Sequence, residues 1–123
     1  MRYLILALLM IATPVYALPE KHYQKETCNG IMEYRLDDGS RVDCLTEEYA
    51  IEYDFANKWA EAVGQSLYYA EKTGKKPAII LILKDEKQKK HLPKVEVLCR
   101  KYGIELGVIC SQRSSLSDNL FQF

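Results

Sequence analysis

The sequence lacks several patterns that commonly identify a function. It contains no glycine-rich phosphate-binding loop, no Cys-x-x-Cys pair and no repeated or low-complexity segment. Its two histidines, His22 and His91, have no nearby serine or cysteine pattern that suggests a catalytic dyad. These absences argue against a phosphate-binding loop, a zinc site and a histidine-activated nucleophile.

A strong net charge and long hydrophobic segments are also absent. The chain has 17 Lys and Arg residues against 17 Asp and Glu residues, so any polyanion site must be a local patch. The apolar run from Leu4 to Ala12 falls well short of the roughly 20 residues that span a bilayer. No other segment is long and apolar enough to do so.

The first residues have the order of a secretory signal peptide. Arg2 supplies a short positive region, the apolar run follows, and Val15-Tyr16-Ala17 ends in the small residues that a signal peptidase requires. A membrane anchor is the alternative, and the short run argues against it. We therefore expect residues 1–17 to be removed, leaving an exported protein, periplasmic or secreted, with no membrane attachment.

The four cysteines all follow this segment. An even number in an exported chain of this length predicts two disulfides. Three pairings exist, and the sequence alone does not decide between them. We favour Cys28–Cys44 and Cys99–Cys110, because each of these pairs closes a local loop.

Hydrophobic periodicity predicts one α/β domain over residues 31–110, after an N-terminal arm or short helix (18–30) and before a loose tail (111–123). The continuous apolar run 77–83 is typical of a central strand covered on both faces. Asn57 is a suitable N-cap for the helix that precedes it. The expected elements are strands at 32–36, 41–45, 50–56, 77–83 and 104–109, with helices at 57–72 and from about 93 to 103.

Acidic residues gather on one face of the expected three-stranded meander. Glu52 and Asp54 alternate with apolar neighbours, and Asp43 lies on the preceding strand. A three-residue turn at 37–39 would place Glu33 opposite Asp43, whereas a two-residue turn would not. Carboxylates this close repel one another, which a divalent cation or basic partner relieves. The alternative is an ordinary solvated sheet face.

One edge of the following helix carries Lys58, Gln65 and Tyr69 at helical spacing. Lys58 comes so soon after the third strand that we expect it close to Glu52 and Asp54. An ordinary polar helix face is the alternative.

This layout resembles the PD-(D/E)XK nuclease superfamily, and within it the branch with a RecB-type Gln-x-x-x-Tyr helix. The resemblance covers about residues 31–109 and implies a restriction-endonuclease-like fold, a mixed β-sheet of βββαβαβ order flanked by helices. The matching segments are Arg41-Val42-Asp43, Ala50-Ile51-Glu52-Tyr53-Asp54, Lys58 and Gly64-Gln65-Ser66-Leu67-Tyr68-Tyr69-Ala70.

The resemblance also implies a function, the metal-dependent hydrolysis of DNA or RNA phosphodiester bonds. Asp43 and Glu52 would bind Mg²⁺ or Mn²⁺, and Gln65 and Tyr69 would position metal, water or the nucleic-acid backbone. Glu33 would add a further acidic contact.

One position departs from the family pattern. The residue two after Glu52 is Asp54, where the family has a lysine that orients the attacking water. Lys58 would supply this amine from the helix, or Asp54 would be a third metal ligand. In the remaining alternative only the fold is kept, as an inactive exported domain that binds a polyanion or a protein partner.

A basic run follows the expected central strand. Lys87, Lys89 and Lys90 are suited to contact nucleic-acid phosphates. Outside the nuclease interpretation, this run is an ordinary solvated loop. Oligomeric state is not indicated by the sequence.

Overall fold

The computed structural model describes residues 18–111. The predicted signal peptide and all of the predicted tail beyond Ser111 lie outside these residues. None of the described helices is long and apolar enough to cross a membrane.

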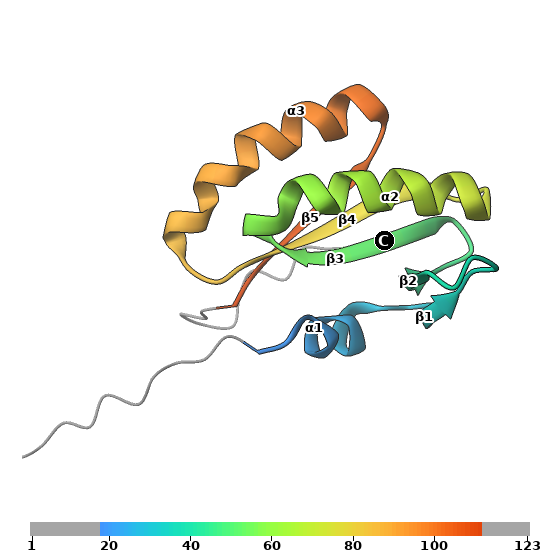
Figure 1. Cartoon of the computed structure of the whole chain (residues 1–123). Coiled ribbons are helices and arrows are strands. Elements are labelled where there is room, and N and C mark those ends of the chain that lie inside the picture. Colours follow the sequence, from blue (N-terminus) through green and yellow to red (C-terminus); the bar gives the residue numbers. More distant parts are fainter. Residues whose placement is uncertain (1–17, 112–123) are drawn as a thin grey trace, which may run out of the picture.

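The described chain forms a five-stranded mixed sheet between helices, which confirms the predicted α/β class. Strands lie in the order β1-β2-β3-β4-β5; β1, β2 and β3 are antiparallel neighbours, and β4 and β5 run parallel to β3. Helix α1 covers one face of the sheet, while α2 and α3 cover the other (Figure 1). The elements are α1 (Glu20–Thr27), β1 (Ile31–Arg35), β2 (Arg41–Leu45), β3 (Tyr49–Phe55), the 3-10 turn η1 (Ala56–Lys58), α2 (Trp59–Thr73), β4 (Lys76–Leu83), the 3-10 segment η2 (Glu86–His91), α3 (Leu92–Tyr102) and β5 (Glu105–Cys110).

Strand β4 is the centre of the core, as its apolar run predicts. Ile80 and Ile82 pack on the α1 side with Tyr23, and Ile79 and Leu81 pack beneath α2 and α3. All four β4 side chains are buried. Two hydrophobic layers therefore meet on one strand, which explains why its sequence shows no alternation.

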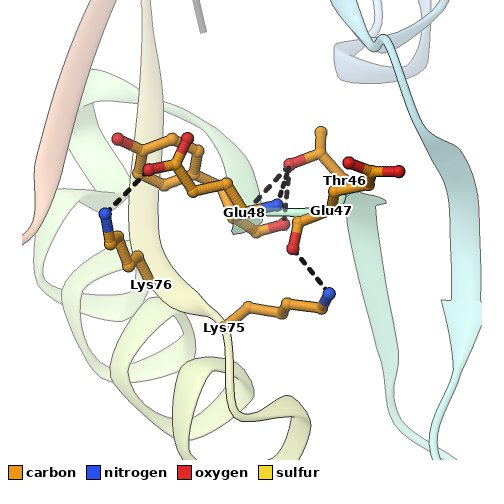
Figure 2. A network of polar contacts seen from close by, with 6 residues as sticks. Thr46, Glu47, Glu48, Lys75 and Lys76 are labelled. Atoms are coloured by element: carbon orange, nitrogen blue, oxygen red, sulfur yellow. Dashed lines mark hydrogen bonds and ion pairs between the residues drawn. The ribbon is translucent and has the colours of Figure 1, made fainter.

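A polar network fixes the start of β3 against the start of β4 (Figure 2). The Lys76 amide donates to the Glu48 carbonyl oxygen at 2.9 Å, and its ammonium lies 2.7 Å from Glu48 Oε1. Lys75 Nζ donates to the Glu47 carbonyl oxygen at 2.6 Å. These contacts set the parallel register in which Glu52 lies beside Ile79.

The cysteine pairing is half as predicted. Cys28 and Cys44 form a disulfide with a Cα–Cα distance of 5.8 Å. The predicted Cys99–Cys110 pair is wrong, because Cys99 is a buried free thiol and Cys110 an exposed one. The Cys99 carbonyl oxygen accepts from the Ile104 amide at the start of β5, whereas Cys110 ends that strand. At about 3.3 Å per strand residue, the strand carries Cys110 about 20 Å away, far beyond disulfide reach.

The start of the long helix also differs from the prediction. The 3-10 turn η1 begins at Ala56, and α2 begins at Trp59 without a side-chain cap. Asn57 therefore lies inside η1 and is not the N-cap. At the other end, Gly74 takes the left-handed φ of 70° that ends the helix.

Candidate functional site

The candidate site lies where the pairing of β2 with β3 stops. Cys44 pairs with Ile51 and Leu45 with Ala50, and the recorded ladder ends before Asp43 and Glu52. Asp43 Oδ2 instead accepts a hydrogen bond from the Tyr53 amide at 2.8 Å. The carboxylate thus takes the place of a main-chain acceptor and is fixed against β3.

Glu52 and Asp54 are both buried, with exposed fractions of 6% and 5%. Glu52 lies beside Ile79 and Asp54 beside Leu81, on the sheet face that α2 and α3 cover. Glu52 Oε2 has no hydrogen-bond partner within residues 18–111. Burying a carboxyl oxygen without a hydrogen-bond partner raises the free energy of the folded protein. This oxygen belongs to the acidic cluster, by which we mean Asp43, Glu52 and Asp54.

Asp43 and Glu52 titrate as a pair. Burial raises the pKa of Glu52 to about 10, and the negative charges of Asp43 and Asp54 add to this shift. Burial likewise raises the pKa of Asp43 to about 6, while its bond from the Tyr53 amide opposes the rise. A hydrogen bond between the two carboxyl groups contributes to both values. At neutral pH and without a cation, the pair therefore retains a proton.

A fourth acid comes from α1, outside the predicted domain. Burial raises the pKa of Asp54 to about 7; the charge of Glu20 and a hydrogen bond with it raise it further. One turn along α1, Gln24 is 3% exposed and its Oε1 has no partner in the described chain. The sequence predicts an arm or a short helix here, and the structure has the helix, but the sequence assigns it no part in the site. The available signal was the four-residue spacing of Glu20 and Gln24 on the face that carries Tyr23.

The helix residues predicted for the site have different environments. Tyr69 is buried, and burial followed by the charges of Glu52 and Asp43 raises its pKa, so its phenol lies within their electrostatic range. Gln65 is half-buried, and the described part of the chain gives it no hydrogen bond. Lys58 is exposed and has no ion pair within residues 18–111, although its charge opposes the rise in the Asp54 pKa.

Glu33 is placed by the predicted three-residue turn. Leu36 donates its amide to the Ser40 carbonyl oxygen at 2.8 Å, and the register on both sides puts Glu33 across from Asp43. Glu33 has a φ of 53°, and the recorded β1–β2 pairs omit it. Its Oε2 lies 3.7 Å from Arg41 Nε, so an ion pair partly neutralises it.

The basic run lies at the carboxyl ends of β3 and β4, where η2 packs beside η1. Lys87 and Lys90 are exposed, whereas Lys89 lies 2.7 Å from Glu86 Oε2. Lys84 adds a cation 4.4 Å from the centre of the Phe55 ring. Of the acids on β3, Asp54 lies nearest to the strand end that the basic run borders.

Metal binding by these acids depends on their number and spacing. Within residues 18–111 no group of three or more His, Cys, Asp or Glu side chains is arranged to hold a metal ion. Mg²⁺ usually requires only one or two carboxylates, since water and substrate phosphates complete its shell. The hard oxygen donors of Asp43 and Glu52 fit that smaller set, and Glu52 Oε2 has no hydrogen-bond partner in the described part of the chain.

Together, the fold and the site define an α/β protein in which the half-buried Asp43 and the buried Glu52 lie where the pairing of β2 with β3 ends. No protein-family model, curated protein or solved structure matches the chain.

Proposed function

We propose that this chain is an exported nuclease of the PD-(D/E)XK type that hydrolyses DNA or RNA phosphodiester bonds with Mg²⁺ or Mn²⁺. The observation that carries the proposal is the interaction of the half-buried Asp43 with the buried Glu52, whose Oε2 has no hydrogen-bond partner within residues 18–111. The order βββαβαβ and the mixed sheet agree with a restriction-endonuclease-like fold, which we propose for this domain.

The proposed metal ligands are Asp43 and Glu52, with Asp54 as a third candidate. A divalent ion bound there would neutralise a phosphate oxygen and lower the pKa of a bound water. The pair is suited to this because removal of its shared proton leaves adjacent negative charges with little solvent to stabilise them. The Tyr53 amide holds Asp43 in position for this role.

Other side chains would orient the substrate. Lys58 has no ion pair in the described chain, so its ammonium is able to turn toward a phosphate beside Asp54. Tyr69 and Gln65 would contribute a phenol and an amide from α2. Lys87 and Lys90 would bind backbone phosphates further along the strand, with Lys89 weakened by its pairing to Glu86.

One observation favours the second candidate, an inactive domain that binds a polyanion or protein. Asp54 replaces the expected lysine, and its carboxyl group interacts with Glu20 of α1. Lys58, the proposed substitute, is exposed. In this case the basic run would bind nucleic acid without cleavage.

The test uses protein exported into an oxidising compartment and then purified. Linear, circular and single-stranded DNA and RNA are incubated with Mg²⁺, with Mn²⁺ or with EDTA. We expect metal-dependent cleavage of at least one substrate. Salt-dependent binding without cleavage would support the second candidate, and neither binding nor cleavage would contradict both.

A further inference from the structure

A single disulfide joins the two elements that flank the acidic pair. Cys28 is the residue that ends α1, and Cys44 lies in β2 directly after Asp43. Helix α1 supplies Glu20 to the cluster, and β2 supplies Asp43. The disulfide therefore links α1 and β2, the two elements that carry Glu20 and Asp43, at a point next to the site.

Few other contacts hold α1 in place. The helix has 8 residues and no side-chain cap at its start, and isolated helices shorter than about 12–15 residues are marginal in water. Within residues 18–111 its attachments are Tyr23, which packs in one cluster with Tyr53 and Cys44, and a 2.7 Å hydrogen bond between Thr27 Oγ1 and Tyr53 Oη. The buried Gln24 and the interaction of Glu20 with Asp54 add to these. Helix α1 is thus the described helix most dependent on a crosslink.

The hairpin β1–β2 is attached at its two ends and through Val42 and the adjoining Leu36, which are buried in one cluster with Tyr69 of α2. At its tip, Lys72 Nζ lies 3.0 Å from Asp37 Oδ1, and the Tyr68 hydroxyl donates to Asp38 Oδ2. At its base, Cys44 and Leu45 pair with β3. Asp43 lies on the side of the base where the ladder has already ended. Its position depends on the Tyr53 amide and on its buried neighbours Val42 and Cys44, of which Cys44 carries the crosslink.

We infer that the Cys28–Cys44 disulfide is a redox switch that assembles the acidic pair when oxidised and loosens it when reduced. The structural part of this inference stands on the crosslink alone; its consequence for cleavage rests on the proposed function. A nuclease with this switch would be inactive in a reducing cytosol and active after export. The cell's own nucleic acid would be spared.

The reduction is an ordinary thiol–disulfide exchange with a dithiol reductant. Cys28 is half-buried and Cys44 fully buried, so the accessible sulfur is Cys28 Sγ. A reductant thiolate bonds to Cys28 Sγ, and the electron pair of the broken bond leaves on Cys44 Sγ, which takes a proton. The second thiolate of the reductant then displaces Cys28, which also takes a proton, and the reductant becomes a cyclic disulfide. Reaction of the two protein thiols with glutathione disulfide reverses the change and yields two glutathione molecules.

The experiment equilibrates purified, exported protein with set ratios of reduced and oxidised dithiothreitol. Three properties are measured: amide hydrogen exchange of residues 20–27, Mn²⁺ affinity and cleavage rate. We expect reduction to accelerate exchange in α1 while β4 stays protected, and to weaken Mn²⁺ binding and cleavage by about 10-fold or more. Reoxidation should restore all three.

Two variants make the result specific to this bond. Cys28→Ser should behave as the reduced form under every condition, and its half-buried position makes it safer for folding than a change at Cys44. Cys110→Ser, which removes an exposed free thiol, should keep the full redox response. A response lost in Cys110→Ser would overturn the inference.

The remaining outcomes separate this inference from the proposed function. Equal α1 exchange and equal Mn²⁺ affinity in both redox states would overturn the switch, even if the protein cleaves nucleic acid. Redox-dependent α1 exchange in a protein that binds no Mn²⁺ and cleaves nothing would support the switch and overturn the proposed nuclease activity.

Discussion

Buried carboxyl groups are the main residue-level feature of this protein. A carboxylate without solvent is stable only when neutralised by a proton, a cation or strong donors. Asp43 has one amide donor, whereas Glu52 has an oxygen with no partner in the described chain. We therefore expect a bound metal ion to change the protonation of Glu52 more than that of Asp43.

Replacing Glu52 with glutamine should separate stability from metal binding. We expect Glu52→Gln to leave the thermal midpoint at pH 8 in EDTA nearly unchanged, because a pKa of about 10 already keeps the Glu52 carboxyl group protonated and uncharged at that pH. The same change should abolish the Mg²⁺-induced rise in that midpoint. Differential scanning fluorimetry measures both, with Glu61→Gln on the exposed face of α2 as the matched control. A metal-induced rise that persists in Glu52→Gln would contradict this account.

The stability of the metal-free protein should fall as pH rises. The native pKa values of Asp43 and Asp54, about 6 and about 7, lie above the ordinary value of 3.8. The native state therefore holds more protons than the unfolded state across this window, and stability is lost as pH rises through the native values. Urea midpoints in EDTA should drop between pH 4.5 and 7.5, and Mg²⁺ should recover part of the loss at pH 7.5. A midpoint that climbs over this range would refute the prediction.

The sequence predicts this site only in part. Alternation along β3 is enough to group Glu52 with Asp54, because side-chain direction in a strand follows from sequence parity. The contribution of Glu20 was missed, because a short polar helix carries little periodic signal and its position depends on a disulfide. The hydrogen bond from Tyr53 to Asp43 was also beyond prediction, since it requires the ladder to stop.

At the scale of elements, β4 determines the stability of the sheet. The side chain of Leu81, a residue of β4, is fully buried beneath α2 and α3. We expect Leu81→Ala to lower the free energy of unfolding by about 3 kcal/mol, because it removes buried methyl groups and leaves a cavity. Val97 on the outer side of α3 is 62% exposed, and Val97→Ala should change stability by less than about 0.5 kcal/mol. Urea denaturation of both variants tests this. Equal losses in the free energy of unfolding would contradict the placement of Leu81 in the core and of Val97 on the surface.

Element types were predictable where the hydrophobic pattern is strong. The apolar run 77–83 and the stripe of α2 are set by burial, which the sequence encodes directly. The N-cap at Asn57 and the Cys99–Cys110 pair failed for a different reason. The first rests on residue type and the second on short sequence separation. In the structure, η1 follows β3 directly, and β5 carries Cys110 away from Cys99.

At the scale of the whole molecule, the separation of charge matters more than its sum. The net charge is zero, yet acids gather beside β3 and lysines gather on η2. Lys87→Ala with Lys90→Ala should weaken nucleic-acid binding at low salt and reduce the slope of log affinity against log salt by about 2. Lys101→Ala, at the far end of α3 from η2, should leave that slope unchanged. Fluorescence anisotropy across a salt series measures the slopes, and equal slopes for both proteins would exclude the η2 contacts.

The disulfide should also be visible in global stability. It links residues separated by 16 positions in the sequence. Its reduction removes a constraint on the unfolded chain and should lower the free energy of unfolding by about 3 kcal/mol. Urea denaturation of the Cys110→Ser protein with and without dithiothreitol isolates this bond from the exposed thiol. No change on reduction would mean that native contacts alone hold α1 and β2 together.

The central claim is that Asp43 and Glu52 form a metal-dependent phosphodiesterase centre. The most direct measurement is the rate of nucleic-acid cleavage by oxidised protein in Mg²⁺, compared between the original chain, Asp43→Asn, Glu52→Gln and the control Glu61→Gln. We predict cleavage that EDTA abolishes, that both site variants lose by at least about 100-fold, and that the control retains. Equal rates in the site variants and the control would contradict the claim.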